Sequence, residues 1–294
     1  REKECEIHLT EKPETVLVAG GGIAGLEAAI ILKKRGHDPI LCEATDTLGG
    51  QFLTAGEAPR KKEMKAAAIS MAKKAERLGV DIRMNTKVTP EMIEEIKPHT
   101  VMNAIGAESI IPPIPGVDKA FVKDSHDVLD GKAEATGNVV VIGGGMVGME
   151  TAEYLAEKGA KVSVLEMLPD ICSDMGTTRK ICMGEEIQKS GIIPVTSIKV
   201  TEIGDNVVIG EKDGEKVEFP CDTAVLAIGA KKRDGSALAE TCYKNGIGYF
   251  EIGDAAMARR AINATREAMD AALTFDREDV HRDVSKPKKL VFIT

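Results

Sequence analysis

The feature that most constrains this chain is a set of landmarks that occurs twice at one fixed spacing. The motif G-x-G-x-x-G spans Gly20–Gly25 and recurs 123 residues later as Gly143–Gly148. The same offset relates Glu43 to Glu166, and the Ala-Ile-Gly-Ala run at Ala104–Ala107 to that at Ala227–Ala230. Three landmarks in one register indicate two copies of one structural unit.

Each copy has the pattern of a buried strand, a helix and a second strand. Short apolar runs are typical of buried strands, and the helix between them shows apolar residues at helical spacing. The segments are 15–19, 23–34 and 39–42 in the first copy, and 138–142, 146–158 and 161–165 in the second. Such a unit forms a right-handed parallel crossover. The sequence therefore predicts an α/β fold with two Rossmann-like domains.

The three glycines of each motif have separate mechanical roles. The first permits a tight turn after the strand, the second lets the backbone approach a pyrophosphate, and the third lets the helix pack closely on the sheet. The start of that helix directs free N–H groups and a partial positive charge toward the phosphates. The positions are Gly20, Gly22 and Gly25 in the first copy, and Gly143, Gly145 and Gly148 in the second.

An acidic residue follows each motif at the spacing of a dinucleotide site. Glu43 and Glu166 each lie 18 residues beyond the third glycine, where the second strand ends. A carboxylate there accepts hydrogen bonds from the adenosine ribose hydroxyls. The alternative is a pair of glycine turns that bind nothing, but two acids in register favour dinucleotide binding at both sites.

The residues around Glu166 favour NADH over NADPH at the second site. The carboxylate should repel a 2′-phosphate, and the next residue, Met167, is not basic. An NADP site usually has an arginine nearby. The nearest basic residues, Arg179 and Lys180, are 13 and 14 residues further on.

Composition and charge exclude several classes of function. The formal net charge of −8 disfavours nucleic acid, and the short basic runs Arg60–Lys62 and Lys231–Arg233 are interpreted as solvated surface. No stretch is long and apolar enough to span a membrane. The six cysteines are scattered, which is typical of a reducing cytoplasm. No histidine has a Cys or carboxylate at ligand spacing, so no metal site is expected.

Further motifs accompany the two units, and together they resemble a known family. The chain resembles the two-dinucleotide-binding flavoproteins of the glutathione and thioredoxin reductase superfamily. More narrowly, it is similar to the C-terminal half of the NADH:flavin oxidoreductases related to 2,4-dienoyl-CoA reductase, 2-enoate reductase and trimethylamine dehydrogenase. The resemblance covers about residues 13–276. It is carried by Val18–Glu27, Glu43, Leu48–Phe52, Ala104–Gly106, Val141–Glu150 and Ile252–Ala255.

The resemblance implies that the first unit binds FAD and that the second unit, inserted within the first, binds NAD(P). The expected FAD-binding domain comprises residues 13–118 and 248–294, and the NAD-binding domain comprises 119–247. Residues 1–12 are expected to be a linker from a preceding region. The run Pro112–Gly116 is expected to lead out of the first domain, because Pro and Gly punctuate domains.

The resemblance also implies further cofactor contacts. Asp254 would accept a hydrogen bond from the flavin ribitol, and Gly50 and Gln51 lie in a loop that passes close to the flavin. Glu150 would either lie near the nicotinamide amide or complement the helix N-terminus, and both roles stay open. The complete predicted set is Gly20, Gly22, Gly25, Glu43, Gly50, Gln51, Ala104, Gly106, Gly253 and Asp254 for FAD, and Gly143, Gly145, Gly148, Glu166 and Gly229 for NAD.

The chain departs from the family pattern in three respects. There is no C-x-x-C pair, and Cys172 and Cys182 are interpreted as isolated thiols. Both copies carry Ala-Ile-Gly where many relatives have Ala-Thr-Gly, so a hydroxyl contact is lost. In the enoate and dienoyl-CoA reductases an N-terminal (β/α)8 barrel carries FMN, the substrate pocket and an iron–sulfur cluster. No such barrel occurs here, and Cys5 is interpreted as a surface thiol.

The implied function is that of an electron-input module, in which hydride passes from NADH to FAD. In a complete enzyme, electrons would continue through the cluster to FMN and reduce an activated alkene. The implied partners are NADH and the barrel domain of the same chain, and a homo-oligomer of the full-length protein is compatible with the sequence. Two alternatives stay open. The module could hold only ADP, as in trimethylamine dehydrogenase, or it could be a stand-alone NADH:ferredoxin-type reductase.

Overall fold

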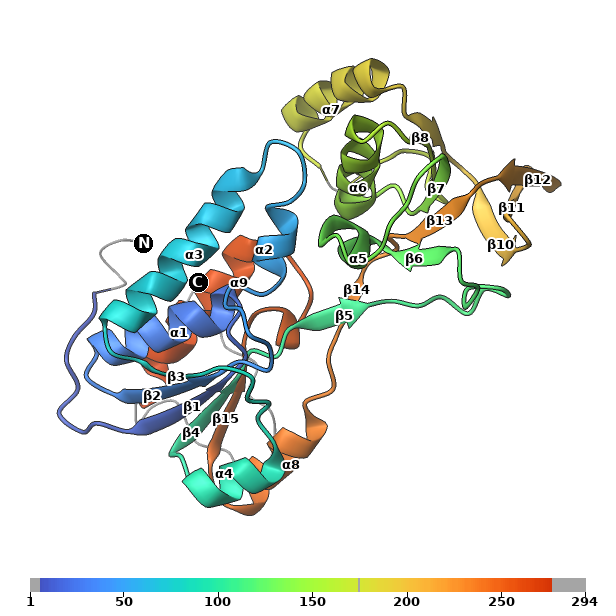
Figure 1. Cartoon of the computed structure of the whole chain (residues 1–294). Helices are drawn as coiled ribbons and strands as arrows, with labels where there is room; N and C mark the ends of the chain where they lie inside the picture. The colour runs from blue at the N-terminus through green and yellow to red at the C-terminus, as the bar shows by residue number, and fades with distance from the viewer. Residues whose placement is uncertain (1–5, 174, 277–294) are drawn as a thin grey trace. The chain divides into compact units, whose positions relative to one another are not determined.

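The computed structural model describes residues 6–173 and 175–276, which form two compact units (Figure 1). Unit 1 comprises Glu63–Glu108 together with the described residues up to Leu53 and from Lys231 onward. Unit 2 comprises Thr54–Lys62 and Ser109–Ala230. Each unit has its own parallel sheet and its own apolar core, so the predicted α/β class with two Rossmann-like units is confirmed.

Unit 1 is built on a five-stranded parallel sheet. In spatial order its strands are β15 (Gly248–Glu251), β4 (Thr100–Asn103), β1 (Thr15–Ala19), β2 (Asp38–Cys42) and β3 (Asp81–Arg83). One face packs against α1 (Ile23–Lys34), α3 (Lys62–Arg77) and α9 (Ala261–Thr274). The other face packs against α4 (Pro90–Ile96) and α8 (Ser236–Lys244). Figure 1 shows these helix layers on the two sides of the sheet. The short helix α2 spans Gln51–Ala55.

Unit 2 repeats the sheet but differs in what covers it. Its strands, in spatial order, are β6 (Val122–Asp124), β13 (Thr223–Leu226), β7 (Asn138–Ile142), β8 (Lys161–Leu165) and β9 (Ile193–Val195). One face packs against α5 (Ser125–Leu129), α6 (Met146–Glu157) and α7 (Thr177–Ser190). The other face packs against an antiparallel sheet of β10 (Lys199–Ile203), β11 (Val207–Lys212) and β12 (Glu215–Pro220).

The predicted repeat holds at the level of individual elements. Strand β7 begins and ends 123 residues after β1, and the same offset relates α6 to α1, β8 to β2 and β13 to β4. It also relates β14 (Ala230–Lys232) to β5 (Ala107–Ser109), which pair with each other. Strand register is copied too, since Thr15 pairs with Asp38 and Asn138 with Lys161.

The boundaries of the compact units differ from the predicted domain boundaries at both points where the chain passes between the two domains. The run Pro112–Gly116 lies inside unit 2, because the Ile203 N–H donates to the Pro115 carbonyl at 2.8 Å and Ile114 packs into that core. The sequence predicts residues 231–247 in the NAD-binding domain, whereas in the structure they belong to unit 1. Their helix α8 buries Leu238 and Cys242 in the core of unit 1. Cys5 and residues 277–294 lie outside the described residues.

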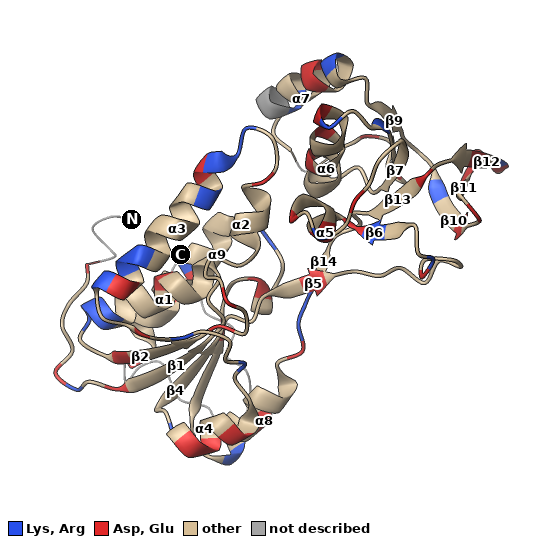
Figure 2. Cartoon of the chain, viewed as in Figure 1, with Lys and Arg blue, Asp and Glu red and all other residues tan. Residues whose placement is uncertain are grey.

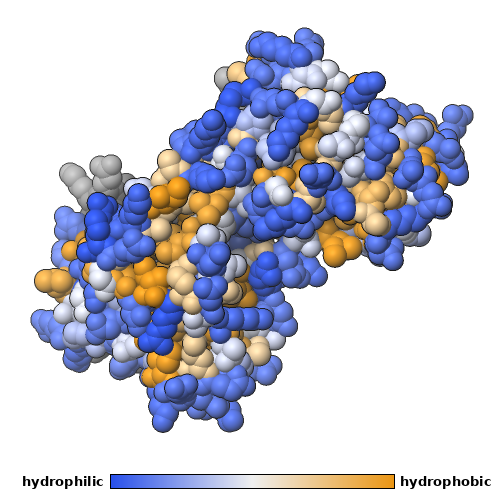
Figure 3. All heavy atoms as spheres, in the orientation of Figure 1, coloured by the Kyte–Doolittle hydropathy of each residue, from blue (hydrophilic) through white to orange (hydrophobic). Residues whose placement is uncertain are grey.

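The core is largely aliphatic, since Phe, Tyr and Trp together make up only 3% of the chain. Strands β1 and β7 contribute runs of fully buried valine, leucine and isoleucine. In Figure 2 the central strands are tan, and charges of both signs are spread over the helices and outer loops. Figure 3 shows the hydrophilic residues that cover most of the visible surface, with apolar side chains exposed between them. Met257 and Ile262 are among the large apolar residues that are more than half exposed.

A cavity in unit 1 and matching glycine turns in both units

The glycine turn of unit 1 joins β1 to α1 and has no room for side chains at two positions. Gly20 has φ +110°, and a Cβ there would lie 2.3 Å from the Ala104 carbonyl oxygen. A Cβ at Gly25 would lie 1.9 Å from the Gly20 carbonyl oxygen. At Gly22, in contrast, a Cβ would meet no protein atom within 4 Å. The open position is the one where the backbone is expected to approach a pyrophosphate.

The turn of unit 2 has the same geometry. Gly143 has φ +110°, and a Cβ there would lie 2.4 Å from the Ala227 carbonyl oxygen. A Cβ at Gly148 would lie 1.9 Å from the Gly143 carbonyl oxygen, whereas Gly145 faces open space. The strained first glycine, the open second glycine and the tightly packed third glycine therefore recur in both copies.

Each predicted acid closes its own glycine turn. Glu43 accepts hydrogen bonds from the Gly21 N–H at 2.7 Å, from the Thr45 N–H at 2.8 Å and from the Thr45 hydroxyl at 2.8 Å. Glu166 accepts from the Gly144 N–H at 2.7 Å and from the Leu168 N–H at 2.8 Å. Sequence reasoning missed this anchoring role. A carboxylate has about four acceptor sites, so each acid retains the capacity to accept at least one further hydrogen bond.

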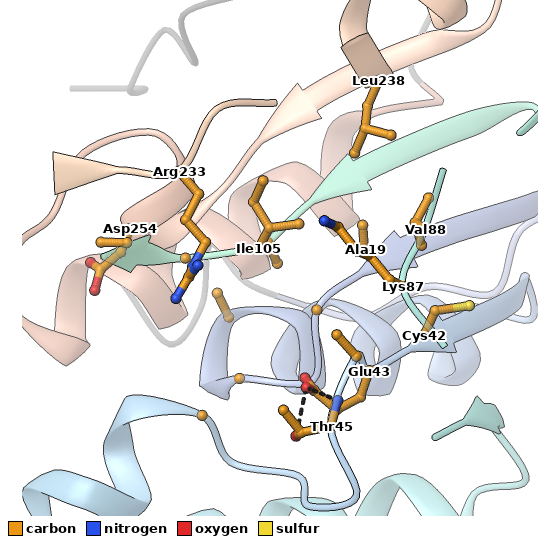
Figure 4. Close-up of a pocket in the computed structure, with 18 of the residues that line it drawn as sticks. Ala19, Cys42, Glu43, Thr45, Lys87, Val88, Ile105, Arg233, Leu238 and Asp254 are labelled. Carbon is orange, nitrogen blue, oxygen red and sulfur yellow. Dashed lines mark hydrogen bonds between the residues drawn. The ribbon is translucent and has the colours of Figure 1, made fainter. Parts of the chain in front are cut away.

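Unit 1 contains a cavity of about 880 Å³ that begins at this turn. Its lining includes the segments Thr86–Glu91 and Cys42–Thr45 near the acid, and Ala104–Glu108 further along. In Figure 4, Asp254 lies away from Glu43 across the cavity. The predicted residues that line it are Gly20, Gly22, Glu43, Gly50, Gln51, Ala104, Gly106 and Asp254.

The other two predicted residues of unit 1, Gly25 and Gly253, lie outside the cavity lining and pack against it. Gly25 packs α1 against the turn, and Gly253 holds φ +62° directly before Asp254. The Gln51 side chain donates to the Ala107 carbonyl at 3.1 Å. In unit 2, Gly229 has φ +105° and accepts from the Ile110 N–H at 3.0 Å. Gly106 has φ +79°, so the glycine of each Ala-Ile-Gly turn has a positive φ.

Two basic side chains that sequence reasoning did not select also line the cavity. Lys87 comes from the segment before α4, and Arg233 comes from the segment before α8. Figure 4 shows both side chains reaching into the cavity. Arg233 lies 3.8 Å from Glu108 and is half exposed. Arg233 is therefore exposed, as the sequence predicts for the run Lys231–Arg233, and also forms part of the cavity lining.

Asp254 lies in the 3-10 turn Gly253–Ala255. Burial raises the pKa of its carboxyl, although the hydrogen bond from the Arg259 N–H at 3.1 Å acts in the opposite direction. The side chain is therefore a partly desolvated acceptor at the cavity wall. That is the kind of group that binds a sugar-like hydroxyl well, because its water shell is already incomplete.

Glu150 has a partner that neither predicted role included. It is buried on α6, and its carboxylate forms an ion pair with the Lys61 ammonium group. The neighbouring Arg60 lies 3.1 Å from Glu153 and 3.4 Å from Glu186. The basic run Arg60–Lys62, interpreted from the sequence as solvated surface, thus contributes two side chains that neutralise acids of α6 and α7.

The cysteines do not form a redox pair among the described residues. Cys172 is buried and Cys182 is exposed, and both are free thiols. Within residues 6–173 and 175–276, no helix combines the length and the hydrophobicity needed to cross a bilayer.

Family models match both parts of this geometry. The model described as pyridine nucleotide-disulphide oxidoreductase matches residues 89–254, more than half of the chain. The chain belongs to this family. A second model, described as FAD dependent oxidoreductase, matches residues 15–105.

The relatives narrow the family further. The chain is 41% identical over 230 residues to a bilirubin reductase of Mediterraneibacter gnavus, covering 78% of this chain and 36% of the relative. It is 39% identical over 272 residues to an NADH oxidase of Thermoanaerobacter brockii, covering 91% and 42%. A solved 2-naphthoyl-CoA reductase complex superposes with TM-score 0.86 at 29% identity, covering 92% and 41%. The chain thus spans about two fifths of the length of these relatives.

These matches support the resemblance found in the sequence. The chain corresponds to the FAD- and NAD-binding half of the enoate reductase-like flavoenzymes. It is a flavin-dependent oxidoreductase module that uses a nicotinamide nucleotide. The alternative of a purely structural ADP-holding module is not favoured by relatives that are reductases and oxidases.

Proposed function

We propose that unit 1 binds FAD, that unit 2 binds NADH in preference to NADPH, and that the module transfers reducing equivalents from NADH to FAD. The observation that carries this proposal is the cavity of about 880 Å³ that extends from the glycine turn to Asp254. Small-molecule sites usually measure about 300–1,000 Å³. A cavity near the upper limit suits a whole flavin dinucleotide better than its ADP half alone.

The residues that line the cavity fit the chemical parts of FAD. Gly22 leaves backbone space for the pyrophosphate, and Lys87 and Arg233 supply positive charge in the same cavity. Glu43 would accept from the adenosine ribose, and Asp254 would accept from the ribitol. Bound FAD supplies the two-electron acceptor. The protein supplies position and electrostatics, and no side chain needs to donate or accept a proton in that transfer.

The preference for NADH rests on the surroundings of Glu166. Its carboxylate is buried and held by two backbone N–H groups, so it cannot readily swing away from a 2′-phosphate. Met167 beside it is 67% exposed and carries no charge. Lys180, one of the two nearest basic residues, forms an ion pair with Asp170. Both features support a site that does not attract a 2′-phosphate.

We further propose that this module is the electron-input half of a larger reductase. The curated relatives named above are more than twice as long as the matched region. In a complete protein of that kind, a barrel domain with FMN and an iron–sulfur cluster would receive the electrons and reduce an activated alkene. The module alone is expected to reduce only artificial acceptors.

The test is anaerobic reduction of the purified chain loaded with FAD. We expect NADH to bleach the flavin absorbance, and NADPH to do so more slowly. The protein incubated with FAD, without either nicotinamide, is the matched control. A colourless protein that retains ADP and rejects FAD would refute the proposal, and faster bleaching by NADPH would refute only the assigned preference.

A further inference from the structure

The loop that carries Asp254 is held by a buried carboxylate outside the cavity. This loop joins β15 to α9 and begins with Gly253, whose φ is +62°. A Cβ at Gly253 would lie 2.8 Å from the Cβ of Ala24 and 3.2 Å from that of Ala264. The turn is therefore pressed between α1 and α9. The position of Asp254 at the cavity wall therefore depends on how α9 packs against the loop, as well as on the local backbone conformation.

Glu267 on α9 binds both ends of this loop. It is only 4% exposed. One carboxylate oxygen accepts the Gly253 N–H at 3.0 Å, and the other forms an ion pair with the Arg259 guanidinium. Arg259 in turn donates its backbone N–H to the Asp254 carboxylate at 3.1 Å. Burying a carboxylate costs desolvation free energy, and the ion pair and hydrogen bond of Glu267 offset this cost.

We propose that Glu267, acting through Gly253 and Arg259, is the positioning residue that holds Asp254 at the wall of the cavity. This inference rests on the proposed FAD site of unit 1. Glu267 is absent from the cavity lining, so it acts on a bound nucleotide only by fixing the loop. The competing possibility is that Glu267 only stabilises the packing of α9. In that case, removing Glu267 would change FAD affinity by the same factor whether or not Asp254 is present.

A double-mutant cycle separates the two roles. Glu267→Gln keeps the shape and an acceptor for Gly253 but removes the charge that binds Arg259. We expect it to weaken FAD binding about tenfold, and Asp254→Ala to weaken it at least as much. In the double variant the loss should stay within about twofold of Asp254→Ala alone, because residues that act as a unit are not additive. Arg266→Gln, an exposed neighbour on α9, should change FAD affinity less than about twofold.

Two results would overturn the proposal while the wild type binds FAD. One is an affinity unchanged by Glu267→Gln, and the other is a double variant in which the two losses multiply. If Glu267→Gln does not fold, Arg259→Met removes the same ion pair from the loop side and enters the same cycle.

Hydrogen exchange in the nucleotide-free protein provides an independent readout. Glu267→Gln should accelerate exchange in residues 253–259 while α9 keeps its protection. Faster exchange along the whole of α9 would show a general structural role and would overturn the proposal. A wild type that binds no FAD would refute the proposed function. The hydrogen-exchange measurement alone would then test whether Glu267 holds the loop.

Discussion

The two halves of this chain share one turn but differ in what surrounds it. In both units the first glycine has φ +110°, the third touches the first, and an acid accepts the N–H of the residue between the first two glycines. In unit 1, Asp254, Lys87 and Arg233 line the cavity beside the turn. Unit 2 has a three-stranded sheet where unit 1 has α4 and α8. The comparison teaches that the turn is common to both units, whereas the surroundings of the turn differ; under our proposal, these surroundings distinguish one nucleotide from the other.

The largest effect should come from filling the third glycine of either copy. In Gly25→Ala and Gly148→Ala the new methyl group would lie 1.9 Å from a carbonyl oxygen. We expect each to lower the free energy of unfolding of its own unit by about 3 kcal/mol or more, because overpacking forces the backbone to shift. Denaturant unfolding followed by hydrogen exchange would measure this unit by unit.

The matched control is Gly184→Ala, since Gly184 lies in α7 with nothing within 4 Å. It should be neutral or slightly stabilising, because alanine favours helices. A large loss in one unit and none in the other would break the equivalence of the two turns.

Filling the second glycine should affect binding while leaving the fold intact. Gly22 and Gly145 have φ −69° and −71°, which alanine adopts freely, and both face open space. We expect Gly22→Ala to weaken FAD binding about 100-fold and Gly145→Ala to weaken NADH binding by a similar factor. The unfolding free energies should change by less than about 0.5 kcal/mol.

Titration of each variant with each nucleotide tests this assignment. A loss of NADH affinity in Gly22→Ala, with FAD affinity retained, would reverse our allocation of the two nucleotides to the two units.

A smaller effect is expected at the residue after the second acid. Met167→Arg places a cation beside Glu166 at a 67% exposed position. We expect the ratio of flavin reduction rates with NADPH and NADH to rise about tenfold, since arginine accommodates the 2′-phosphate. Ile193→Arg changes a similarly exposed apolar residue of the same unit. If it raised the ratio equally, general surface charge would explain the result.

The smallest predicted effect is that the stabilities of the two units depend on pH in opposite directions. The hydrogen bond with Asp124 raises the pKa of His126 in unit 2, and burial only partly opposes this. The stabilisation of unit 2 by protonated His126 is complete below the ordinary pKa of about 6.5, and it is lost as pH rises through the raised pKa. In unit 1, burial and then Arg35 lower the pKa of His37. Its stabilisation is present above about pH 6.5 and is lost as pH falls through the lowered value.

Hydrogen exchange measured across this pH range would follow both units at once. His126→Gln should flatten the alkaline decline of unit 2, and His37→Gln should flatten the acidic decline of unit 1. A common pH dependence that both variants leave unchanged would contradict the assignment.

Much of the fold could be predicted because its signals are local. A buried strand, a turn that requires glycine and a helix of suitable length each depend on neighbouring residues. For this reason the elements of both copies appear at the predicted offset. The boundaries were harder to predict. Residues 231–247 follow unit 2 in the chain, yet α8 packs in unit 1 because Leu238 and Cys242 complete the apolar layer over its sheet.

The sequence by itself determined the two turns, their acids, the family and the order of the elements. Only the tertiary structure decided that Lys61 neutralises Glu150, that Arg233 lines the cavity, and that Glu267 holds the loop of Asp254. The physical reason is that these contacts join residues that packing brings together; Lys61 and Glu150 are 89 positions apart in the sequence. A charged side chain looks the same in the sequence whether it faces water or a buried partner. Burial and distance, which exist only in the folded chain, make the difference.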